Sequence, residues 1–255
     1  MEKQLQQQKF LFAKVLDAAQ SSALHHKKTT TDFMDRYKSE IFFEKAKSIQ
    51  NVKAMVFGGY EESERRMIAF APDYMELTEQ DFPIQALHIT KNKKFGQADL
   101  NHRDYLGSIL ALGIDRAKLG DIIVLEQQTI CYVHKNFAEY IKNTLEYVSR
   151  TKVDVSVSDI SAVMLPKKEW KYQTITVASL RLDAVAGGAF HMARGKVQQY
   201  IKKEFVQLNW NITTNTSCLL KQGDMISIRG FGRIKIFEIG NITKKDRICV
   251  TIGRE

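Results

Sequence analysis

Basic side chains gather in the last third of this 255-residue chain, in a pattern that could bind the phosphates of a nucleic acid. Residues 180–255 hold 13 Lys and Arg against 6 Asp and Glu, whereas residues 1–179 hold 25 against 23. A net charge of +7 on residues 180–255, against +2 on residues 1–179, is typical of a polyanion-binding module. A generally basic surface would give the same numbers. The candidate contact residues are Arg181, Arg194, Lys196, Gln198, Lys202, Lys203, Asn209, Arg229, Phe231, Arg233 and Lys235.

The arginines suit this role because a planar guanidinium can donate two parallel hydrogen bonds to one phosphate. We expect the basic residues of 181–203 to meet phosphates from a helical side, and those of 229–235 to meet them from a hairpin. Phe231 stands between two glycines, where its ring could stack on an unpaired base. It could equally fold back onto the sheet as a hydrophobic plug.

Two short helices and a small sheet must position these residues. In the second helix Arg194, Gln198 and Lys202 recur every four residues along an exposed stripe, beside a packed stripe that contains Val197 and Ile201. The expected helices run to about Ala186, before Gly187-Gly188, and over 193–203. Strands are expected over 205–210 and 225–228. A turn at 229–233 should lead into a further strand, in which Arg233, Lys235 and Phe237 face away from Ile234 and Ile236.

These segments resemble the S4-type RNA-binding domain. The resemblance is carried by Arg181-Leu182-Asp183, Ala193-Arg194, Val206-x-Leu208-Asn209 and Gly223-Asp224-x-Ile226. It implies two short helices on a small bent sheet that grip structured RNA. The chain departs from the pattern at Ala193, where a helix-capping serine is usual, and at Glu204, where a glycine that readily takes positive φ is usual.

The central segment predicts a β-α-β-β-α-β order, which is that of ferredoxin-like domains and of RNA-recognition motifs. The expected elements are a strand at 84–90, a helix at 102–112, strands at 121–125 and 129–134, a helix at 136–148 and a strand at 153–157. The third strand offers one aromatic residue, Tyr132, where RNA-recognition motifs present paired stacking aromatics.

The first segment predicts a mixed helix and strand domain without recognisable chemistry. We expect helices over 5–19, from about 32–34 and over 44–49, then strands at 52–57 and 66–71 around the turn signal Gly58-Gly59. The chain is therefore expected to be a multidomain α+β protein. Its predicted parts are an N-terminal mixed domain at 1–78, a ferredoxin-like domain at 79–160, a connection at 161–178 and an S4-type domain at 179–255.

The resemblance extends upstream to the YlmH family of bacterial S4-domain proteins. It is carried by the run His102-Arg103-Asp104-Tyr105-Leu106-Gly107, by Leu112-Gly113-Ile114 and by Gly120-Asp121-Ile122. The resemblance implies binding to ribosomal RNA of the large subunit, with transfer RNA or peptidyl-transfer RNA as a further partner, and a role in rescuing stalled nascent chains. YlmH genes also lie beside cell-division genes, so an adaptor linked to cell division is an alternative.

No catalytic, metal or cofactor site is predicted from the sequence. The chain lacks the GxxxxGK[ST], GxSxG and HExxH patterns, and His102-Arg103-Asp104 lacks the asparagine that a kinase loop needs, because Ile109 stands there. Three distant cysteines and the absence of a long apolar run indicate a soluble cytoplasmic protein without a membrane partner, expected to be a monomer. The alternative in this class is an RNA-modifying enzyme of pseudouridine synthase or methyltransferase type, targeted by its S4-type domain.

Overall fold

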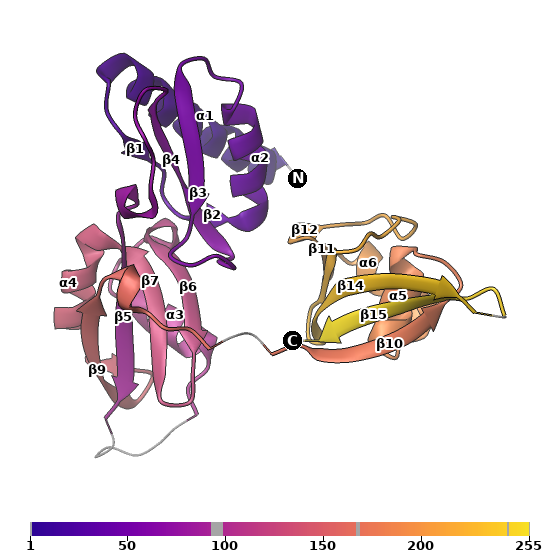
Figure 1. Ribbon diagram of the computed structural model, residues 1–255. Coiled ribbons are helices and arrows are strands. Elements are labelled where there is room, and N and C mark those ends of the chain that lie inside the picture. The colour runs from indigo at the N-terminus through magenta and orange to yellow at the C-terminus, as the bar shows by residue number, and fades with distance from the viewer. Residues whose placement is uncertain (1, 93–98, 167–168, 244, 255) are drawn as a thin grey trace. The chain divides into compact units, whose positions relative to one another are not determined.

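The chain divides into two compact units, Met1–Met164 and Leu165–Glu255. The computed structural model describes residues 2–92, 99–166, 169–243 and 245–254 (Figure 1). Each unit is mixed α+β, and together the described residues form three antiparallel sheets. The expected α+β class is therefore confirmed. Residues 167 and 168 of the predicted connection lie outside the described residues.

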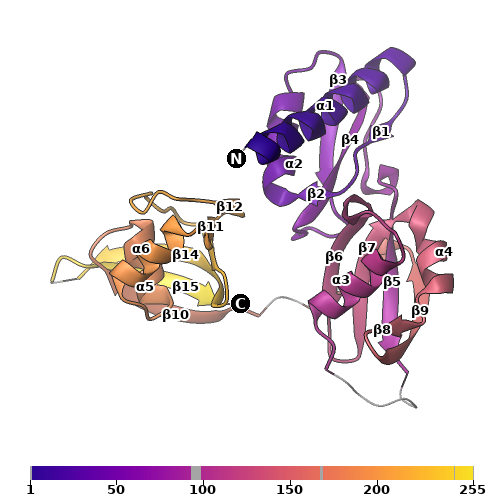
Figure 2. The same ribbon diagram turned by 180° about the vertical axis from the view of Figure 1, so that it is seen from behind.

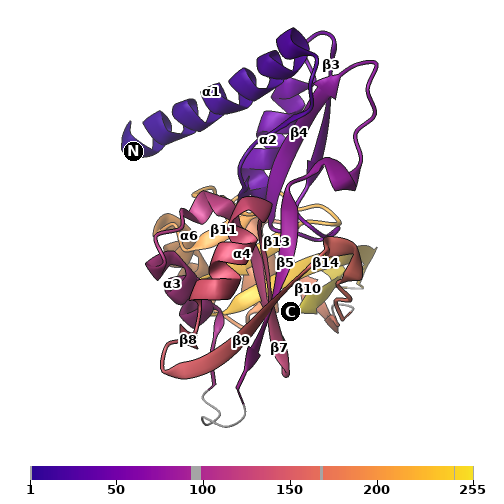
Figure 3. The ribbon, with the colours of Figure 1, turned by 90° about the vertical axis from the view of Figure 1, so that its left-hand side faces the viewer.

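The N-terminal part of the first unit packs two helices on a four-stranded sheet in which β4 is the central strand (Figure 3). Its elements are α1 (Glu2–His25), β1 (Thr29–Thr30), β2 (Met34–Asp35), α2 (Arg36–Ala46), β3 (Val52–Phe57) and β4 (Arg65–Pro72). The core between helices and sheet contains Val15, Ala19, Phe42, Ile68 and Phe70. The two predicted strands are present and pair with each other.

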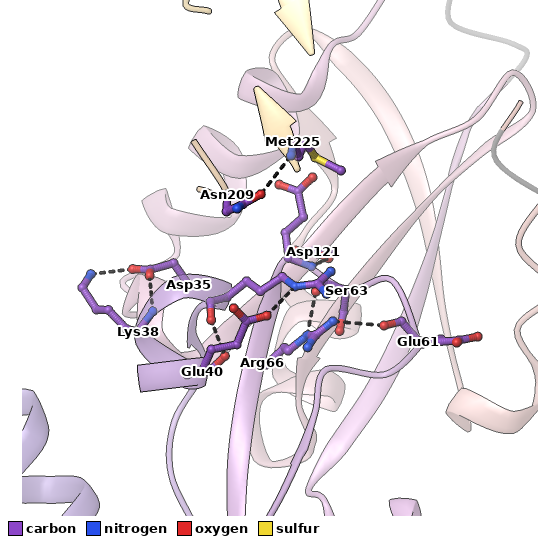
Figure 4. A network of polar contacts seen from close by, with 12 residues as sticks. Asp35, Lys38, Glu40, Glu61, Ser63, Arg66, Asp121, Asn209 and Met225 are labelled. Atoms are coloured by element: carbon purple, nitrogen blue, oxygen red, sulfur yellow. Dashed lines mark hydrogen bonds and ion pairs between the residues drawn. The ribbon is translucent and has the colours of Figure 1, made fainter. Parts of the chain in front are cut away.

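The predicted helix start at 32–34 is wrong. Met34 and Asp35 instead pair with β4, and the helix begins at Arg36. Asp35 is the N-cap, because its extended backbone lets the carboxylate accept the Lys38 amide at 2.9 Å (Figure 4). The segment expected as a separate helix at 44–49 is the end of this same helix, which runs to Ala46.

The central part follows the predicted β-α-β-β-α-β order. Its elements are β5 (Ile84–Lys91), α3 (His102–Ala111), β6 (Leu119–Val124), β7 (Gln128–His134), α4 (Lys135–Thr144), β8 (Tyr147–Val148) and β9 (Thr151–Ser158), with short 3-10 turns at Glu79–Asp81, Arg116–Lys118 and Ile160–Ala162. The strands lie in the order β6-β7-β5-β9-β8, and α3 and α4 bury Ile109 and Ile141 against Leu87, Cys131 and Val133 (Figure 2). The second helix ends earlier than predicted, because Tyr147–Val148 pairs with β9.

Asp121 joins the N-terminal and central parts of the first unit. Its carboxylate accepts hydrogen bonds from the Tyr60 hydroxyl at 2.8 Å, the Glu64 amide at 2.7 Å and the Arg65 amide at 3.0 Å. Burial raises the pKa of Asp121 above its ordinary value, and these hydrogen bonds offset part of that rise. The Gly-Asp-Ile sequence of the family resemblance therefore lies at a structural joint.

Two further contacts close the same joint. The Arg65 guanidinium donates to the carbonyl oxygens of Leu119, Phe33 and Arg116 at 2.8 to 3.1 Å. A Cβ atom on Gly120 would lie 2.8 Å from the Phe33 ring, so the close approach of the two parts requires glycine there. Beside the joint, Arg66 donates to the carbonyl oxygens of Ser63 and Glu61 (Figure 4).

Tyr132, the single aromatic residue of the third central strand, is fully buried. The ring of Tyr60 stacks on it with a centroid separation of 5.3 Å and an interplanar angle of 25°. Gly59, at φ +102°, brings the turn so close that a Cβ atom would lie 2.4 Å from the Tyr132 ring. The ring that an RNA-recognition motif would offer to a base is therefore covered by the chain itself.

The second unit places two short helices on one face of a six-stranded sheet (Figure 2). Its elements are β10 (Lys171–Val177), α5 (Leu182–Ala189), α6 (Arg194–Lys202), β11 (Val206–Leu208), β12 (Asn211–Ile212), β13 (Met225–Ile228), β14 (Gly232–Ile242) and β15 (Ile248–Arg254). The strand order is β10-β15-β14-β13-β11-β12. Leu182, Val185, Val197, Ile234 and Ile252 form the centre of the core.

Two expectations for this unit are wrong. The connection predicted at 161–178 contains β10, which pairs with β15 from Lys171 to Val177. The first helix does not stop before Gly187-Gly188 but continues to Ala189. Both glycines serve close packing, since a Cβ atom on Gly187 would lie 3.1 Å from the Met192 carbonyl oxygen and one on Gly188 would lie 3.2 Å from Ile175.

The end of α6 confirms that position 204 needs positive φ. Glu204 has φ +60°, its amide donates to Ile201 O, and the next amide donates to Tyr200 O, which is the Schellman pattern. We expect Glu204→Gly to stabilise the protein by about 0.5 to 1 kcal/mol, because glycine adopts this conformation without steric cost. The midpoint of urea unfolding measures the change.

Glu139→Gly is the matched control for that substitution. Glu139 is exposed within α4, where glycine should destabilise by about 1 kcal/mol instead. A Glu204→Gly protein no more stable than the wild type would contradict the strain assigned to this helix end.

Candidate nucleic-acid interface

A buried carboxylate gathers three of the predicted contact residues. The Asp183 side chain has 0% exposure and lies at the start of α5. It accepts hydrogen bonds from Arg181 Nε and Nη2 at 3.2 and 3.3 Å, from Arg194 Nη2 at 3.1 Å and from Gln198 Nε2 at 2.7 Å. Arg194 Nε also lies 3.0 Å from its second oxygen. We call these four residues the Asp183 cluster.

The Asp183 cluster forms where the first turns of α5 and α6 lie close together. Arg181 is the N-cap of α5, and Asp183 follows in the first turn, where a negative charge is favourable. Arg194 opens α6, and Gln198 lies one turn later on the same stripe. Both helix starts therefore meet at one carboxylate, which fixes the directions of two arginine side chains.

The Asp183 carboxylate is ionised although it is buried. Burial by itself would raise its pKa, but the hydrogen bonds from Arg181, Arg194 and Gln198 outweigh burial and hold the pKa well below the usual range. The Arg181 side chain is still 33% exposed and that of Arg194 is 51% exposed. Since a guanidinium has five N–H donors, both arginines can bind Asp183 and a phosphate at the same time.

Comparison with known proteins agrees with the central segments that carried the YlmH resemblance. A family model described as "Putative RNA-binding domain in YlmH" matches residues 78–162. The "Ribosome-associated protein quality control protein P2" of Bacillus subtilis (strain 168) is 32% identical over 225 residues, which are 88% of this chain and 86% of that protein. The chain belongs to the YlmH family. A solved structure, "Cell division protein ylmH from Streptococcus pneumoniae", shares 24% identity at a TM-score of 0.49, covering 63% of this chain and 92% of that one.

In this member of the YlmH family, the remaining helical candidates lie beside the Asp183 cluster. Lys196 and Lys202 are exposed on α6, and Lys203 is exposed as its C-cap. Val197 and Ile201 on the other side of the helix are buried, as predicted. The helical side thus presents two oriented arginines and three lysines.

The hairpin candidates are not all on that side. Ile234 and Ile236 of β14 are buried in the core under the helices. Arg233 and Lys235 alternate with them and therefore face the opposite side of the sheet. Arg229, in the turn before β14, is exposed and lies over the Phe205 ring at 5.4 Å. The basic residues of the helices and those of β14 therefore lie on opposite faces of the sheet.

Two candidates are engaged within the protein. Asn209 donates from Nδ2 to Asp224 at 2.9 Å and accepts the Met225 amide at 2.8 Å (Figure 4). Its side chain therefore holds the turn before β13. Phe231 packs on the core and meets Tyr200 edge-on at 5.5 Å, so the structure favours the hydrophobic plug over the base-stacking alternative.

Asp183 is the residue of the candidate site that the sequence did not single out. It appeared only as part of the Arg-Leu-Asp resemblance, and its negative charge made it an unpromising phosphate contact. The signal in the sequence was an acid two residues after an arginine at a helix start, followed by a second helix with an arginine and an amide four residues apart. Only the fold brings these positions together.

The described residues contain neither a candidate metal site nor a candidate membrane-spanning helix. Among residues 2–92, 99–166, 169–243 and 245–254, no group of three or more His, Cys, Asp or Glu side chains could hold a metal ion. In the same part of the chain, no helix is long and apolar enough to cross a membrane.

Proposed function

We propose that this YlmH-family protein is a non-catalytic RNA-binding protein that binds ribosomal RNA of the large subunit through the Asp183 cluster and the lysines of α6. The observation that carries the proposal is the buried carboxylate that orients two partly exposed arginines. The name of the Bacillus subtilis relative supports a role in ribosome-associated quality control. Transfer RNA or peptidyl-transfer RNA is the second proposed partner, and the cytoplasm is the proposed location.

We further propose that the central part is a ferredoxin-like domain and the second unit an S4-type domain. The sheet order β6-β7-β5-β9 supports the first, because it places the first and third strands of the β-α-β-β-α-β series side by side in the centre. The arrangement of α5 and α6 on one face of a small sheet supports the second. On this proposal the S4-type domain includes β10 and begins before position 179.

Arg194→Ala and Lys202→Ala test the proposed surface. Each variant should reduce co-sedimentation with ribosomes by about tenfold, because each removes a charge-assisted hydrogen bond to phosphate. Each should also flatten the dependence of log affinity on log salt, by roughly 0.7 to 0.9 for every phosphate that the variant no longer engages. Sedimentation through a sucrose cushion at several salt concentrations measures both effects.

Lys53→Ala provides the matched control for Lys202→Ala, since Lys53 is exposed on β3 of the first unit. It should leave both affinity and slope unchanged. Unchanged binding in both test variants would overturn the proposed surface. Binding that survives high salt without change would indicate a protein adaptor instead.

The non-catalytic part of the proposal has its own experiment. The purified protein is incubated with bulk RNA, and the nucleosides are then analysed by mass spectrometry. An unchanged nucleoside composition is expected. Stoichiometric modification of any nucleoside would overturn the proposal in favour of an RNA-modifying enzyme.

A further inference from the structure

Three aromatic rings meet on the sheet face of the second unit that lies opposite α5 and α6. The ring of Phe237 lies 5.5 Å from Trp170 and 4.9 Å from Tyr172, both edge-on at about 70°. Tyr172 lies on the other face of β10 from buried Ile175, so its ring points away from the core. Tyr172 as a whole is 63% exposed. We call these three rings, of Trp170, Tyr172 and Phe237, the aromatic face.

A glycine in β15 allows these rings to lie close to the backbone of the sheet. Gly253 of β15 pairs with Tyr172 on one side and with Lys235 on the other. A Cβ atom at Gly253 would lie 2.5 Å from the Phe237 ring and 3.0 Å from Trp170. Since any larger side chain would push the rings outward, the aromatic face requires glycine at this position.

Cations accompany the rings. Lys235 Nζ lies 5.4 Å from the centre of the Phe237 ring, and Arg233 shares the same face of β14. Further along, Arg247 donates to the Thr176 hydroxyl at 3.3 Å. The carboxylate of Glu238, which pairs with Thr251, and that of Glu169, next to Trp170 in the sequence, are also in this region. Arg233 and Lys235 therefore supply cations that phosphates can contact, beside the aromatic rings.

Hydroxyl groups complete the chemistry of this face. Thr174 pairs with Thr251 across β10 and β15, and Ser227 pairs with Arg233 across β13 and β14. Figure 1 shows β10, β15 and β14 in front of the helices, and Figure 2 shows the helices across the other face. A sheet face that the helices of its own unit do not cover, and that carries aromatic rings, cations and hydroxyls, has the groups that RNA-binding sheets use on single strands.

We infer that the aromatic face binds unpaired nucleotides of single-stranded RNA, with Tyr172 stacking on a base and Arg233 and Lys235 meeting phosphates. It is a second RNA-binding surface on the face opposite the Asp183 cluster. The inference rests on the proposed function as an RNA-binding protein and deepens it. The central sheet cannot serve in this way through Tyr132, because Tyr60 covers that ring.

Tyr172→Ala tests the inference in the full-length protein. Tyr172 is mostly exposed, so its removal should leave the fold intact. Affinity for a short labelled oligouridine, which has no stable structure of its own, should fall by about tenfold, as expected when one base no longer stacks on a ring. Fluorescence anisotropy measures this affinity. Tyr74→Ala is the matched control, since Tyr74 in the first unit is also 63% exposed, and it should bind as the wild type does.

A second measurement keeps the inference separate from the proposed function. Oligouridine should quench the emission of the wild-type protein, and Trp170→Phe should remove most of that quenching. Tyr172→Ala should retain co-sedimentation with ribosomes to within about twofold of the wild type, whereas Arg194→Ala should reduce it by about tenfold. The two surfaces are then distinguished by the RNA that each binds.

Two outcomes would overturn the inference. The first is unchanged oligouridine binding in Tyr172→Ala, together with emission that oligouridine does not quench in the wild type. The second is weaker ribosome binding of Tyr172→Ala that is insensitive to salt, without any oligouridine binding by the wild type. That result would assign the aromatic face to a protein partner. Neither outcome bears on Arg194, whose variant tests the proposed function independently.

Discussion

Asp183→Asn is expected to weaken RNA binding by about tenfold or more, although it removes a negative charge from a basic surface. The carboxylate holds Arg181 and Arg194 at distances of 3.0 to 3.3 Å. An amide keeps one acceptor oxygen where the carboxylate has two, carries no charge, and places an NH2 donor where the second oxygen stood, so each guanidinium loses one of its contacts and the ionic attraction at this position. Each arginine is then held less firmly, and RNA binding must restrict it again.

A purely electrostatic surface would respond in the opposite direction. Without positioning, removal of one negative charge should tighten binding to a polyanion. Asp246→Asn supplies this comparison, because Asp246 is exposed in the same unit and the substitution changes the net charge equally. We expect Asp246→Asn to bind as well as or slightly better than the wild type. If the folded Asp183→Asn protein binds as tightly as Asp246→Asn, the positioning role of Asp183 is wrong.

The stability of Asp183→Asn gives an independent check on the same hydrogen bonds. The pKa of Asp183 lies below its value in the unfolded chain, so its contribution to stability is present above about pH 4. That contribution disappears as the pH falls through the lower folded-state value. At neutral pH the wild type should therefore be more stable than Asp183→Asn. The free energies of unfolding of the two proteins should converge as the pH falls. Urea unfolding of both proteins across this range measures the difference.

The elements of the central part could be predicted because their periodicity is strong. Each of its main strands and helices buries a regular set of side chains, such as Leu87 and Ile89 on β5. By contrast, β10 was missed because only Ile175 and Val177 of its seven residues are buried. The rest of that strand is exposed, so its local pattern resembles a connection, and it is held by its pairing with β15.

The candidate site could likewise be predicted only as far as local sequence patterns allow. Alternation along β14 correctly separated Arg233 and Lys235 from Ile234 and Ile236. The sequence could not say which face the two helices would cover, because that depends on long-range packing. For this reason the sequence predicted a helical side and a hairpin side but not that Arg233 and Lys235 lie on the sheet face opposite the helices. Nor could the sequence reveal that Asp183 is enclosed, because burial of a charge becomes favourable only when distant partners converge on it.

Asp121→Ala should have the largest effect on stability, destabilising the first unit by about 3 kcal/mol or more. The substitution removes the acceptor for the Tyr60 hydroxyl and for two backbone amides at the joint between the N-terminal and central parts. Partly buried donors without an acceptor each carry a desolvation cost, and two of these donors are backbone amides, which cannot rotate toward water as a side chain can. The urea midpoint measures the change.

The joint also predicts how unfolding changes. Since Asp121 ties the two parts together, they should unfold in one transition in the wild type and in two separate transitions in Asp121→Ala. Asp159→Ala is the control, because Asp159 is exposed in the same unit and makes no capping hydrogen bond. It should change stability by less than about 0.5 kcal/mol. Equal urea midpoints for Asp121→Ala and Asp159→Ala would contradict the structural role of Asp121. They would also contradict the interpretation that Gly120-Asp121-Ile122 stabilises the fold and does not contact RNA.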